Sequence, residues 1–258
     1  MLPGAWRRLL PAIIGLMLLG SAPGLAQPRK GGVINRGRNG QIKGITVDNL
    51  SDYDYRWFHP GLYFGPSVSR FLIEQSDTYI QRQDIAATST YSPNLSVGGI
   101  ADVRLGGPES PFILRFAPGV NFLTRAVAFE AKGYAGPADS VQTQEVGSTV
   151  IQYPLLLKYQ SDRRRNTRVY LIGGLTYVST ATNRRNDPLR NRLRATDNDL
   201  LLEYGVGLDL FYPLFKFAPE LRFSHGLRNV LVPRNDLLSK SLQSMTTNTV
   251  TLYLNIQN

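Results

Sequence analysis

Residues 215–228 read FKFAPELRFSHGLR, and apolar and polar side chains alternate along nearly all of this stretch. The apolar set contains Phe215, Phe217, Pro219, Leu221, Phe223 and Leu227, and the other set contains Lys216, Ala218, Glu220, Arg222, Ser224 and Arg228. A period of two residues places each set on its own face of a β-strand. The charged face borders either bulk water or a polar lumen, and the rest of the chain decides between the two.

The rest of the chain repeats this alternation and brings the total to about eight predicted strands. The other segments are residues 62–70, 94–105, 112–123, 151–159, 169–179, 202–212 and 249–256, of which 62–70 and 169–179 alternate less cleanly. Alternation of this kind also builds soluble β-sandwiches, so the pattern alone does not place the sheet in a membrane.

The first 26 residues have the layout of a secretory signal peptide. Arg7 and Arg8 precede an apolar run over residues 9–19, and the small residues Gly24 and Ala26 fit a cleavage site. The apolar run is too short for a bilayer core of about 30 Å, which a helix spans with roughly 20 residues. The sequence therefore predicts an exported chain, and no later segment is apolar enough for a membrane helix.

Composition narrows the class of protein. Hydrophobic residues make up 42% of the 258 residues and the mean hydropathy is −0.18, which is too polar for a helical membrane protein. These values suit a membrane barrel, whose wall needs an apolar residue only at every second position. The chain has no cysteine, so disulfides, thiol chemistry and a lipidated cysteine are excluded.

The charge balance is basic. The net charge is +10, or about +8 without Arg7 and Arg8, and it predicts acidic partners such as lipopolysaccharide or the cell wall. We expect no nucleic acid as a partner, because the exported chain has no basic-aromatic binding motif.

Three features favour a membrane barrel over a soluble sandwich. Tyrosine and phenylalanine lie near the strand ends, as in the aromatic girdles at the two membrane interfaces. The polar faces carry small residues and charges of both signs, which suit a lumen that eight strands leave just wide enough for side chains. The connections alternate between short ones at 106–110, 160–166 and 212–214 and long ones at 73–91, 130–147, 182–199 and 229–246. Short periplasmic turns and long external loops are typical of outer-membrane barrels with both termini in the periplasm.

We therefore predict an all-β fold, an eight-stranded antiparallel up-and-down transmembrane β-barrel in the outer membrane of a Gram-negative cell. The predicted domains are a signal peptide over residues 1–26, a basic, glycine-rich periplasmic segment over 27–56 and the barrel over 57–258. From Gln27 to Lys43 the segment carries five basic residues and no acidic one. We expect this part to be disordered, as a periplasmic tether or a spacer.

Charged residues on the predicted inner faces are expected to fill the lumen. They are Asp102, Arg104, Arg115, Lys158, Glu203, Asp209, Lys216, Glu220 and Arg222. Because an unpaired buried charge is costly and eight strands leave no aqueous channel, a salt-bridged plug is favoured over a transport path. Gly173, Gly174, Gly205 and Gly207 lie within strands, so they fit relief of crowding in the lumen better than a nucleotide-binding loop.

Catalytic chemistry is not expected. The two histidines, His59 and His225, lie at opposite ends of the predicted barrel, which argues against a shared metal or a histidine-based relay. Ser224 neighbours His225, but adjacent strand residues point to opposite faces. The sequence thus predicts no catalytic, cofactor-binding or metal-binding residues and no small-molecule substrate.

Two basic clusters are candidates for contact with a partner or with lipid. The first lies in a predicted periplasmic turn and contains Arg163, Arg164 and Arg165, and the second lies in a predicted external loop and contains Arg184, Arg185, Arg190, Arg192 and Arg194. The first could meet a periplasmic partner or inner-leaflet headgroups, and the second could bridge phosphates of lipopolysaccharide. Solvated loop charge is the alternative for each cluster.

The chain from about Asp52 to its C-terminus resembles the PorT (also SprT) family of Bacteroidetes barrels. The resemblance rests on FHPGLYFG at 58–65, LRFAPG at 114–119, IQYPLLLKY at 151–159, YGVGLD at 204–209 and YPLFKFAPELRFS at 212–224. The last block is especially similar, with a tight turn, a Phe-Lys-Phe start and a Pro-Glu-Leu centre. The chain departs from the family in its basic lead over residues 27–47 and in ending without a terminal aromatic residue.

The resemblance implies a non-enzymatic outer-membrane component of type IX protein secretion and gliding motility. The resemblance makes envelope proteins of the secretion machinery the expected protein partners, beside the outer-membrane lipid and lipopolysaccharide that the barrel and its basic charge predict. The family brings no catalytic residues to carry over. The alternative is a general structural or surface-interaction barrel, whose long loops bind lipopolysaccharide, cells or another envelope protein.

Overall fold

The structure is a computed structural model that describes residues 33–36, 42–46, 48–76, 85–131, 141–181, 196–231 and 242–258. The chain divides into two compact units, Met1–Val47 and Asp48–Asn258. In the first unit, β1 (Val33–Arg36) and β2 (Ile42–Thr46) pair antiparallel. The expectation of a disordered lead is therefore wrong for these two strands. The predicted signal peptide lies outside the described residues.

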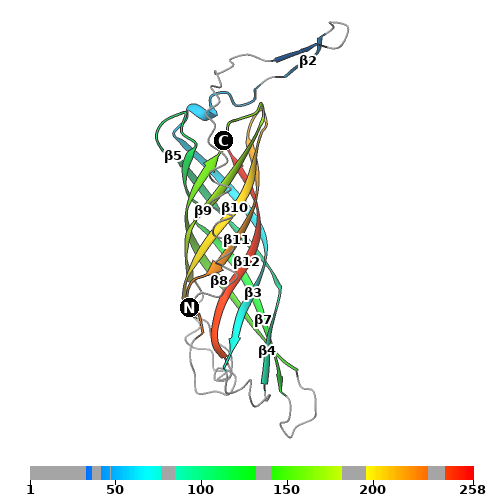
Figure 1. The fold of residues 1–258 in the computed structure, drawn as a ribbon, viewed down its shortest axis with the longest axis vertical. Coiled ribbons are helices and arrows are strands. Elements are labelled where there is room, and N and C mark those ends of the chain that lie inside the picture. The colour runs from blue at the N-terminus through cyan, green and yellow to red at the C-terminus, as the bar shows by residue number, and fades with distance from the viewer. Residues whose placement is uncertain are drawn as a thin grey trace, which may run out of the picture. The chain divides into compact units, whose positions relative to one another are not determined.

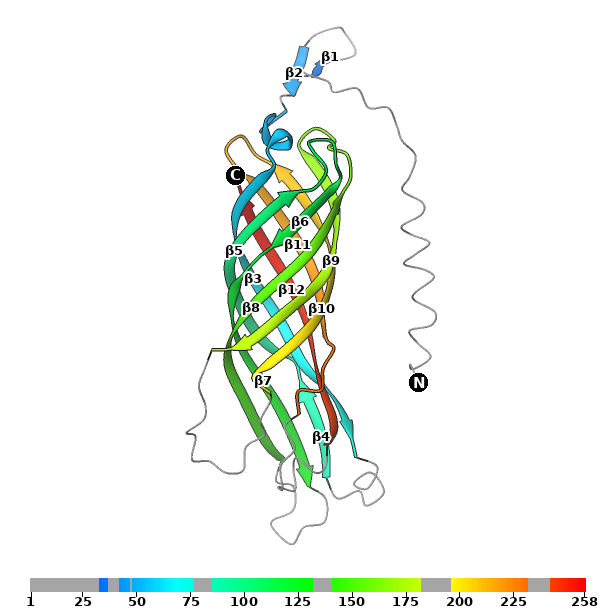
Figure 2. The ribbon, with the colours of Figure 1, turned by 90° about the vertical axis from the view of Figure 1, so that its left-hand side faces the viewer.

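The second unit is a barrel formed by one antiparallel sheet (Figure 1, Figure 2). After the 3-10 helix η1 (Tyr53–Tyr55), its strands are β3 (Phe58–Gln75), β4 (Ile85–Thr90), β5 (Ser92–Arg104), β6 (Phe112–Phe116), β7 (Gly119–Ala131), β8 (Val141–Gln160), β9 (Thr167–Thr180), β10 (Asn198–Phe211), β11 (Lys216–Gly226) and β12 (Leu242–Gln257). The strand order is β3-β12-β11-β10-β9-β8-β6-β5-β7-β4, and further pairings of β3 with β5 and of β8 with β7 close the ring.

The ten labelled strands of this sheet form eight strands of the barrel wall, because two of the wall strands are each interrupted once. Only Tyr91 separates β4 from β5, and only Ala117 and Pro118 separate β6 from β7. Pro118 has no N–H to donate to a neighbouring strand, which explains an interruption there. Each pair therefore continues one strand of the wall, and the predicted eight-stranded antiparallel up-and-down barrel is confirmed among the described residues.

Alternating polarity explains why the sheet closes with a polar interior. Along β11, Lys216, Glu220 and Arg222 are buried, whereas Leu221 between them is 39% exposed. Large apolar side chains collect on the outer surface of every wall strand, and Leu62 of β3 is 70% exposed. An outer wall of this kind is suited to lipid. No helix among the described residues is long and apolar enough to cross a membrane.

The two ends of the barrel differ in their connections. Short connections join β5 to β6, β8 to β9 and β10 to β11 at one end, which we call the short-connection end. The connections from β3 to β4, β7 to β8, β9 to β10 and β11 to β12 are longer, and the strand ends that they join lie at the other end of the barrel, which we call the long-connection end. β8 has 20 residues and β3 has 18, whereas a tilted strand crosses a bilayer with about 9–11 residues. These strands are therefore long enough to continue beyond the hydrocarbon.

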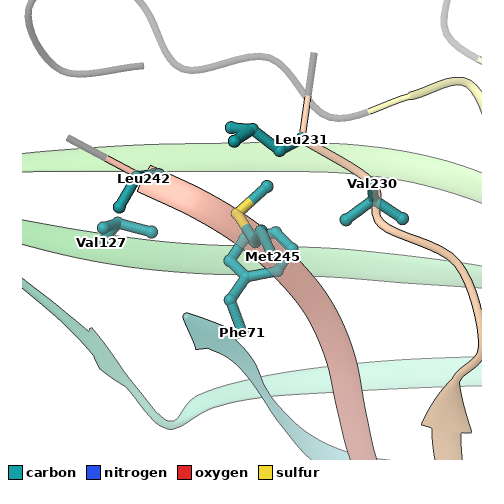
Figure 3. Close-up of a cluster of buried hydrophobic side chains, with 6 residues drawn as sticks. All are labelled: Phe71, Val127, Val230, Leu231, Leu242 and Met245. Carbon is teal, nitrogen blue, oxygen red and sulfur yellow. The ribbon is translucent and has the colours of Figure 1, made fainter. Parts of the chain in front are cut away.

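Apolar side chains gather inside the barrel wall where β3, β7 and β12 approach their long connections (Figure 3). Phe71 and Met245 pack there with Val230 and Leu231 of the segment that follows β11. The segment is held to β12, because the backbone N–H of Val230 donates to the carbonyl of Met245 at 2.9 Å. A second cluster joins Leu123, Val150, Val178 and Leu201 of four adjacent strands. The sequence pattern did not predict these apolar parts of the interior.

Two adjacent glycines of β9 offer a direct test of the packing. A Cβ atom at Gly174 would lie 2.3 Å from the backbone oxygen of Leu155, whereas one at Gly173 would meet nothing closer than 3.6 Å. Overpacking against backbone costs typically 1–3 kcal/mol, so Gly174→Ala is expected to lower the free energy of unfolding by about that amount. Gly173→Ala, the matched control, is expected to change it little. Denaturant unfolding of the purified variants measures both, and equal stability of the two would contradict this packing.

Candidate functional site

A layer of charged side chains crosses the axis of the lumen, in the half of the barrel nearer the short-connection end. These side chains come from β5, β6, β8, β10 and β11, where the two-residue period turns them all inward. They are Asp102, Arg115, Lys158, Glu203, Asp209, Lys216, Glu220 and Arg222, and each is at most 2% exposed. We call this set the central charge layer.

Arg115 connects two sides of the barrel. Its Nε and one terminal nitrogen donate to both carboxylate oxygens of Asp102, at 2.7 and 2.8 Å. Its other terminal nitrogen donates to Oε2 of Glu220 at 2.7 Å. Arg222 continues the network, because it donates to Glu220 and, at 3.0 Å, to Oε2 of Glu203. Bidentate arginine–carboxylate pairs of this kind are among the strong hydrogen bonds of proteins.

The other half of the layer is built around Asp209. Nζ of Lys158 donates to its two oxygens at 3.0 and 3.1 Å, and Nζ of Lys216 lies 3.6 Å from Oδ1. Tyr170 links the two halves, since its hydroxyl donates to Glu220 at 2.7 Å and its ring lies 3.6 Å from Nζ of Lys158. Gly207 makes room for that ring, because a Cβ there would lie 2.2 Å from Cζ of Tyr170.

The central charge layer is electrically balanced and dry. Its four carboxylates face four cations, and every member has an ion-pair partner within the layer. With at most 2% exposure, these side chains leave almost no surface that a water molecule can reach. The barrel is therefore closed at this level, as eight strands allow.

Residues 48–57 close the short-connection end, and we call them the N-terminal clasp. Tyr53 is 4% exposed and stacks on His59, with 4.0 Å between ring centroids. Nε2 of His59 donates to the carbonyl oxygen of Tyr53 at 2.8 Å, and Nζ of Lys216 lies 4.6 Å from the ring of Tyr53. Burial, helped by the carboxylates of Asp102 and Asp209, raises the pKa of Tyr53 well above its ordinary value, so the hydroxyl stays neutral.

Asp54 of the clasp binds three arginines from different parts of the barrel. Its carboxylate lies 3.2 Å from Arg104, 2.9 Å from Arg168 and 3.7 Å from Arg163. Arg163 also donates to the carbonyls of Asn49 and Leu50, and it covers the ring of Phe211 at 3.8 Å. The clasp therefore ties the chain before β3 to β5, to β9 and to the connection between β8 and β9.

The charged residues that the sequence places in the lumen fall into two groups. Eight of the nine form the central charge layer, and Arg104 binds Asp54 of the clasp. Among the arginines proposed for contact, Arg163 is held by the clasp, and Arg164 and Arg165 are exposed between β8 and β9. The loop arginines Arg184, Arg185, Arg190, Arg192 and Arg194 lie outside the described residues.

Neither histidine is placed for catalysis with a neighbouring serine. His225 faces outward and bonds Tyr204 and Asn248, whereas Ser224 is buried and donates to Oε1 of Glu203 at 3.1 Å. Within the described part of the chain, no group of three or more histidine, aspartate or glutamate residues could hold a metal ion.

Several members of the site were not predicted. Tyr53 and Asp54 precede the first strand, in a stretch without periodicity, and no local signal marks them. Arg168 and Tyr170 lie in β9, where both faces are fairly apolar and the pattern is weak. Arg168, Tyr170 and Ile172 stand at alternate positions of β9, so the two-residue period places all three on the same, inner face.

Comparison with known proteins agrees with this architecture. A sequence model of the family described as outer membrane protein beta-barrel domain matches residues 39–232, more than half of the chain. A comparison with curated protein sequences gives no match.

Three solved structures show a distant likeness. Neisserial surface protein A is 9% identical with a TM-score of 0.37, over 76% of this chain and 96% of that one. OprG from Pseudomonas aeruginosa is 12% identical with a TM-score of 0.41, over 78% and 93%. The N-terminal β-barrel domain of Pseudomonas aeruginosa OprF is 11% identical with a TM-score of 0.32, over 74% and 96%. On the strength of the family match, this chain belongs to the outer membrane protein beta-barrel domain family and is an outer-membrane β-barrel protein.

Proposed function

We propose that this chain is a non-enzymatic outer-membrane component of type IX protein secretion and gliding motility of the PorT type, and that its barrel does not conduct the cargo. The central charge layer carries the second part of the proposal. It leaves no space for water at its level, and a secreted protein needs far more room than water does. The role is therefore that of an anchor or an assembly partner in the membrane.

The association with secretion is supported by the residues that resemble the PorT family. They coincide with the interior of the barrel: FHPGLYFG contains His59 of the clasp contact, and LRFAPG contains Arg115. YPLFKFAPELRFS supplies the connection from β10 to β11 and three members of the central charge layer. The resemblance thus concerns the parts of this chain that fill and close its lumen.

Deletion of the gene tests the association with secretion. We expect type IX cargo to disappear from the medium and gliding to stop, and the wild-type gene to restore both. Normal export and gliding after deletion would contradict the proposal. If adhesion or lipopolysaccharide packing then changed instead, the alternative of a surface-interaction barrel would hold.

That alternative is favoured by one observation of its own. β3 and β8 are long enough to continue past the hydrocarbon at the long-connection end, where they would present wall and loops to the outside. Lipopolysaccharide is the proposed partner of this end, and envelope proteins of the secretion machinery are the proposed partners of the exposed residues Arg164 and Arg165 at the other end.

The closed lumen predicts an electrically silent protein. We expect the purified full-length barrel to give no steady ionic current in planar bilayers, because the central charge layer admits no water. A porin of known conductance, reconstituted in parallel, controls for insertion. Stable openings that scale linearly with voltage would contradict the closed lumen.

We further propose that the short-connection end and the N-terminal segment face the periplasm. The chain contains no cysteine, so single cysteines report orientation without background. Gln243→Cys at the long-connection end is expected to react with a membrane-impermeant maleimide in intact cells, whereas Glu109→Cys between β5 and β6 is expected to react only after permeabilisation. Both positions are exposed, which makes them matched probes. The reverse labelling pattern would contradict the orientation.

A further inference from the structure

A row of polar and aromatic side chains interrupts the apolar outer wall toward the long-connection end. It contains Tyr204 of β10, His225 of β11, Asn248 of β12, Arg70 of β3 and Tyr91, which separates β4 from β5. His225 lies directly opposite Asn248 in the sheet, and Asn248 directly opposite Arg70. All three are half-buried and alternate with buried neighbours, so their side chains point outward. We call these five residues the polar row.

Hydrogen bonds order one half of the polar row. Nδ1 of His225 lies 2.7 Å from Oδ1 of Asn248, and because a carboxamide oxygen only accepts, Nδ1 carries the proton. In the neutral imidazole, Nε2 then accepts from the hydroxyl of Tyr204, which lies 3.0 Å away. The carboxamide oxygen of Asn248 thus already accepts a hydrogen bond from His225. The amide nitrogen of Asn248 forms no hydrogen bond with any described residue, so its two N–H groups are available to a ligand.

Arg70 supplies the charge of the other half. Its guanidinium carbon lies 4.7 Å from the centroid of the Tyr91 ring, a cation–π contact. Within the described part of the chain, no carboxylate forms an ion pair with Arg70. The carboxylate of Glu74, four residues further along β3, accepts from Ser244 at 2.6 Å. Arg70 is therefore an outward-facing cation whose counterion does not come from the described chain.

The position of the polar row on the wall indicates where that counterion lies. Between Arg70 and the short-connection end, the outward residues Val68, Phe64 and Leu62 of β3 are apolar and 44–70% exposed. Trp57, Phe112, Tyr159, Tyr212 and Phe215 form an exposed aromatic girdle at the short-connection end. A cation on the outer wall is costly in the middle of the hydrocarbon and tolerated near its boundary. The next outward residue of β3 beyond Arg70, Leu72, is again apolar and 49% exposed. The polar row therefore lies close to the second boundary of the membrane, near the level of the lipid headgroups.

We propose that the polar row binds a phosphate group of lipopolysaccharide. Arg70 would form charge-assisted hydrogen bonds to the phosphate oxygens, and the amide nitrogen of Asn248 beside it would donate two more. The Cβ atoms of cross-strand neighbours stand about 5 Å apart, and Arg70 lies between Asn248 on one side and Tyr91 on the other. A phosphate over β3 and β12 would therefore meet both groups once the guanidinium turns from Tyr91. The choice of lipopolysaccharide rests on the orientation proposed above. The binding itself is independent of any role in secretion.

Lipid binding by the purified full-length protein tests this proposal. In a non-ionic detergent without phosphate, native mass spectrometry counts the lipopolysaccharide molecules bound at increasing concentration. Arg70→Gln is expected to weaken this binding at least about tenfold, the usual effect of losing a charge-assisted hydrogen bond. Asn248→Leu, which keeps the branched shape of the side chain and removes the whole amide, including the oxygen that pairs with His225, is expected to weaken it as well. Heat-dependent migration in gels confirms that each variant is folded.

Two arginines serve as matched controls. Arg228→Gln removes the same charge just beyond β11, and Arg56→Gln removes it in the clasp, and both residues are exposed. Neither variant is expected to change binding. Lipopolysaccharide stripped of its phosphates is expected to bind wild type and Arg70→Gln equally weakly, and inorganic phosphate is expected to leave binding unchanged. Equal binding of intact and stripped lipid, an equal loss in Arg228→Gln, or displacement by inorganic phosphate would each overturn the proposal. These lipid-binding measurements are independent of the secretion test, so the outcome in the deletion strain neither supports nor contradicts them.

Discussion

Replacing Arg115 by methionine is expected to lower the free energy of unfolding by about 3–5 kcal/mol, the usual cost of breaking a buried ion pair. The variant leaves Asp102 and Glu220 buried with one cation fewer, so the central charge layer carries an excess negative charge. Domains are typically stable by only about 5–15 kcal/mol, so this is a large fraction of the total. Denaturant unfolding in detergent micelles measures the change.

A double variant separates lost charge balance from lost packing. Arg115→Met with Asp102→Leu removes one charge of each sign and leaves Glu220 paired with Arg222. Replacing a whole buried pair by apolar groups is often close to neutral, so we expect the double variant to be clearly more stable than the single one. Arg164→Met, at an exposed position, is the control and is expected to stay within about 0.5 kcal/mol of wild type. Equal stability of Arg115→Met and Arg164→Met would mean that the charges are not desolvated.

Replacing Tyr53 by alanine is expected to cost about 3 kcal/mol or more, as for other large buried aromatic residues. The ring lies between His59 and Phe211 and below the ammonium group of Lys216, and its loss would leave a cavity at the short-connection end. Thermal unfolding measures the effect. We also expect faster proteolysis near residue 50, because the N-terminal clasp loses its buried contact.

A neighbouring tyrosine provides the control for this experiment. Tyr55 belongs to the same turn of helix η1 but is 62% exposed. Tyr55→Ala is therefore expected to change stability by no more than about 0.5 kcal/mol. Equal effects of the two substitutions would show that the clasp is not inserted as described.

The sequence predicts the barrel well because its wall is specified locally. In β10 and β11, each residue faces inward or outward according to its place in a two-residue period, and Asp209, Glu220 and Arg222 can be placed from that period alone. The lengths of the connections also predict that one end of the barrel carries short turns and the other carries long loops. No long-range information is needed for either inference.

The clasp is the opposite case. Asp54 meets Arg168 across 114 positions of sequence, and Asn49 meets the carbonyl of Phe211 across 162. Such contacts arise only once the ring has closed, and no periodic pattern precedes them. The apolar clusters inside the wall are not predicted for a related reason, because Leu201 stands between two other leucines, Leu200 and Leu202. In these places composition does not distinguish the two faces of a strand.

The partners of Arg115 have a consequence for biogenesis. Arg115 stands on β6 and Glu220 on β11, and these strands lie across the lumen from each other in the order of the sheet. Before the first and last strands pair, these charged side chains stay hydrated. The unclosed sheet then has one apolar face and one charged face. Dehydration and neutralisation then coincide with the final seam between β3 and β12. An incomplete barrel with hydrated charges on one face inserts poorly into the hydrocarbon of the bilayer. We therefore expect stable membrane insertion to coincide with closure of the barrel.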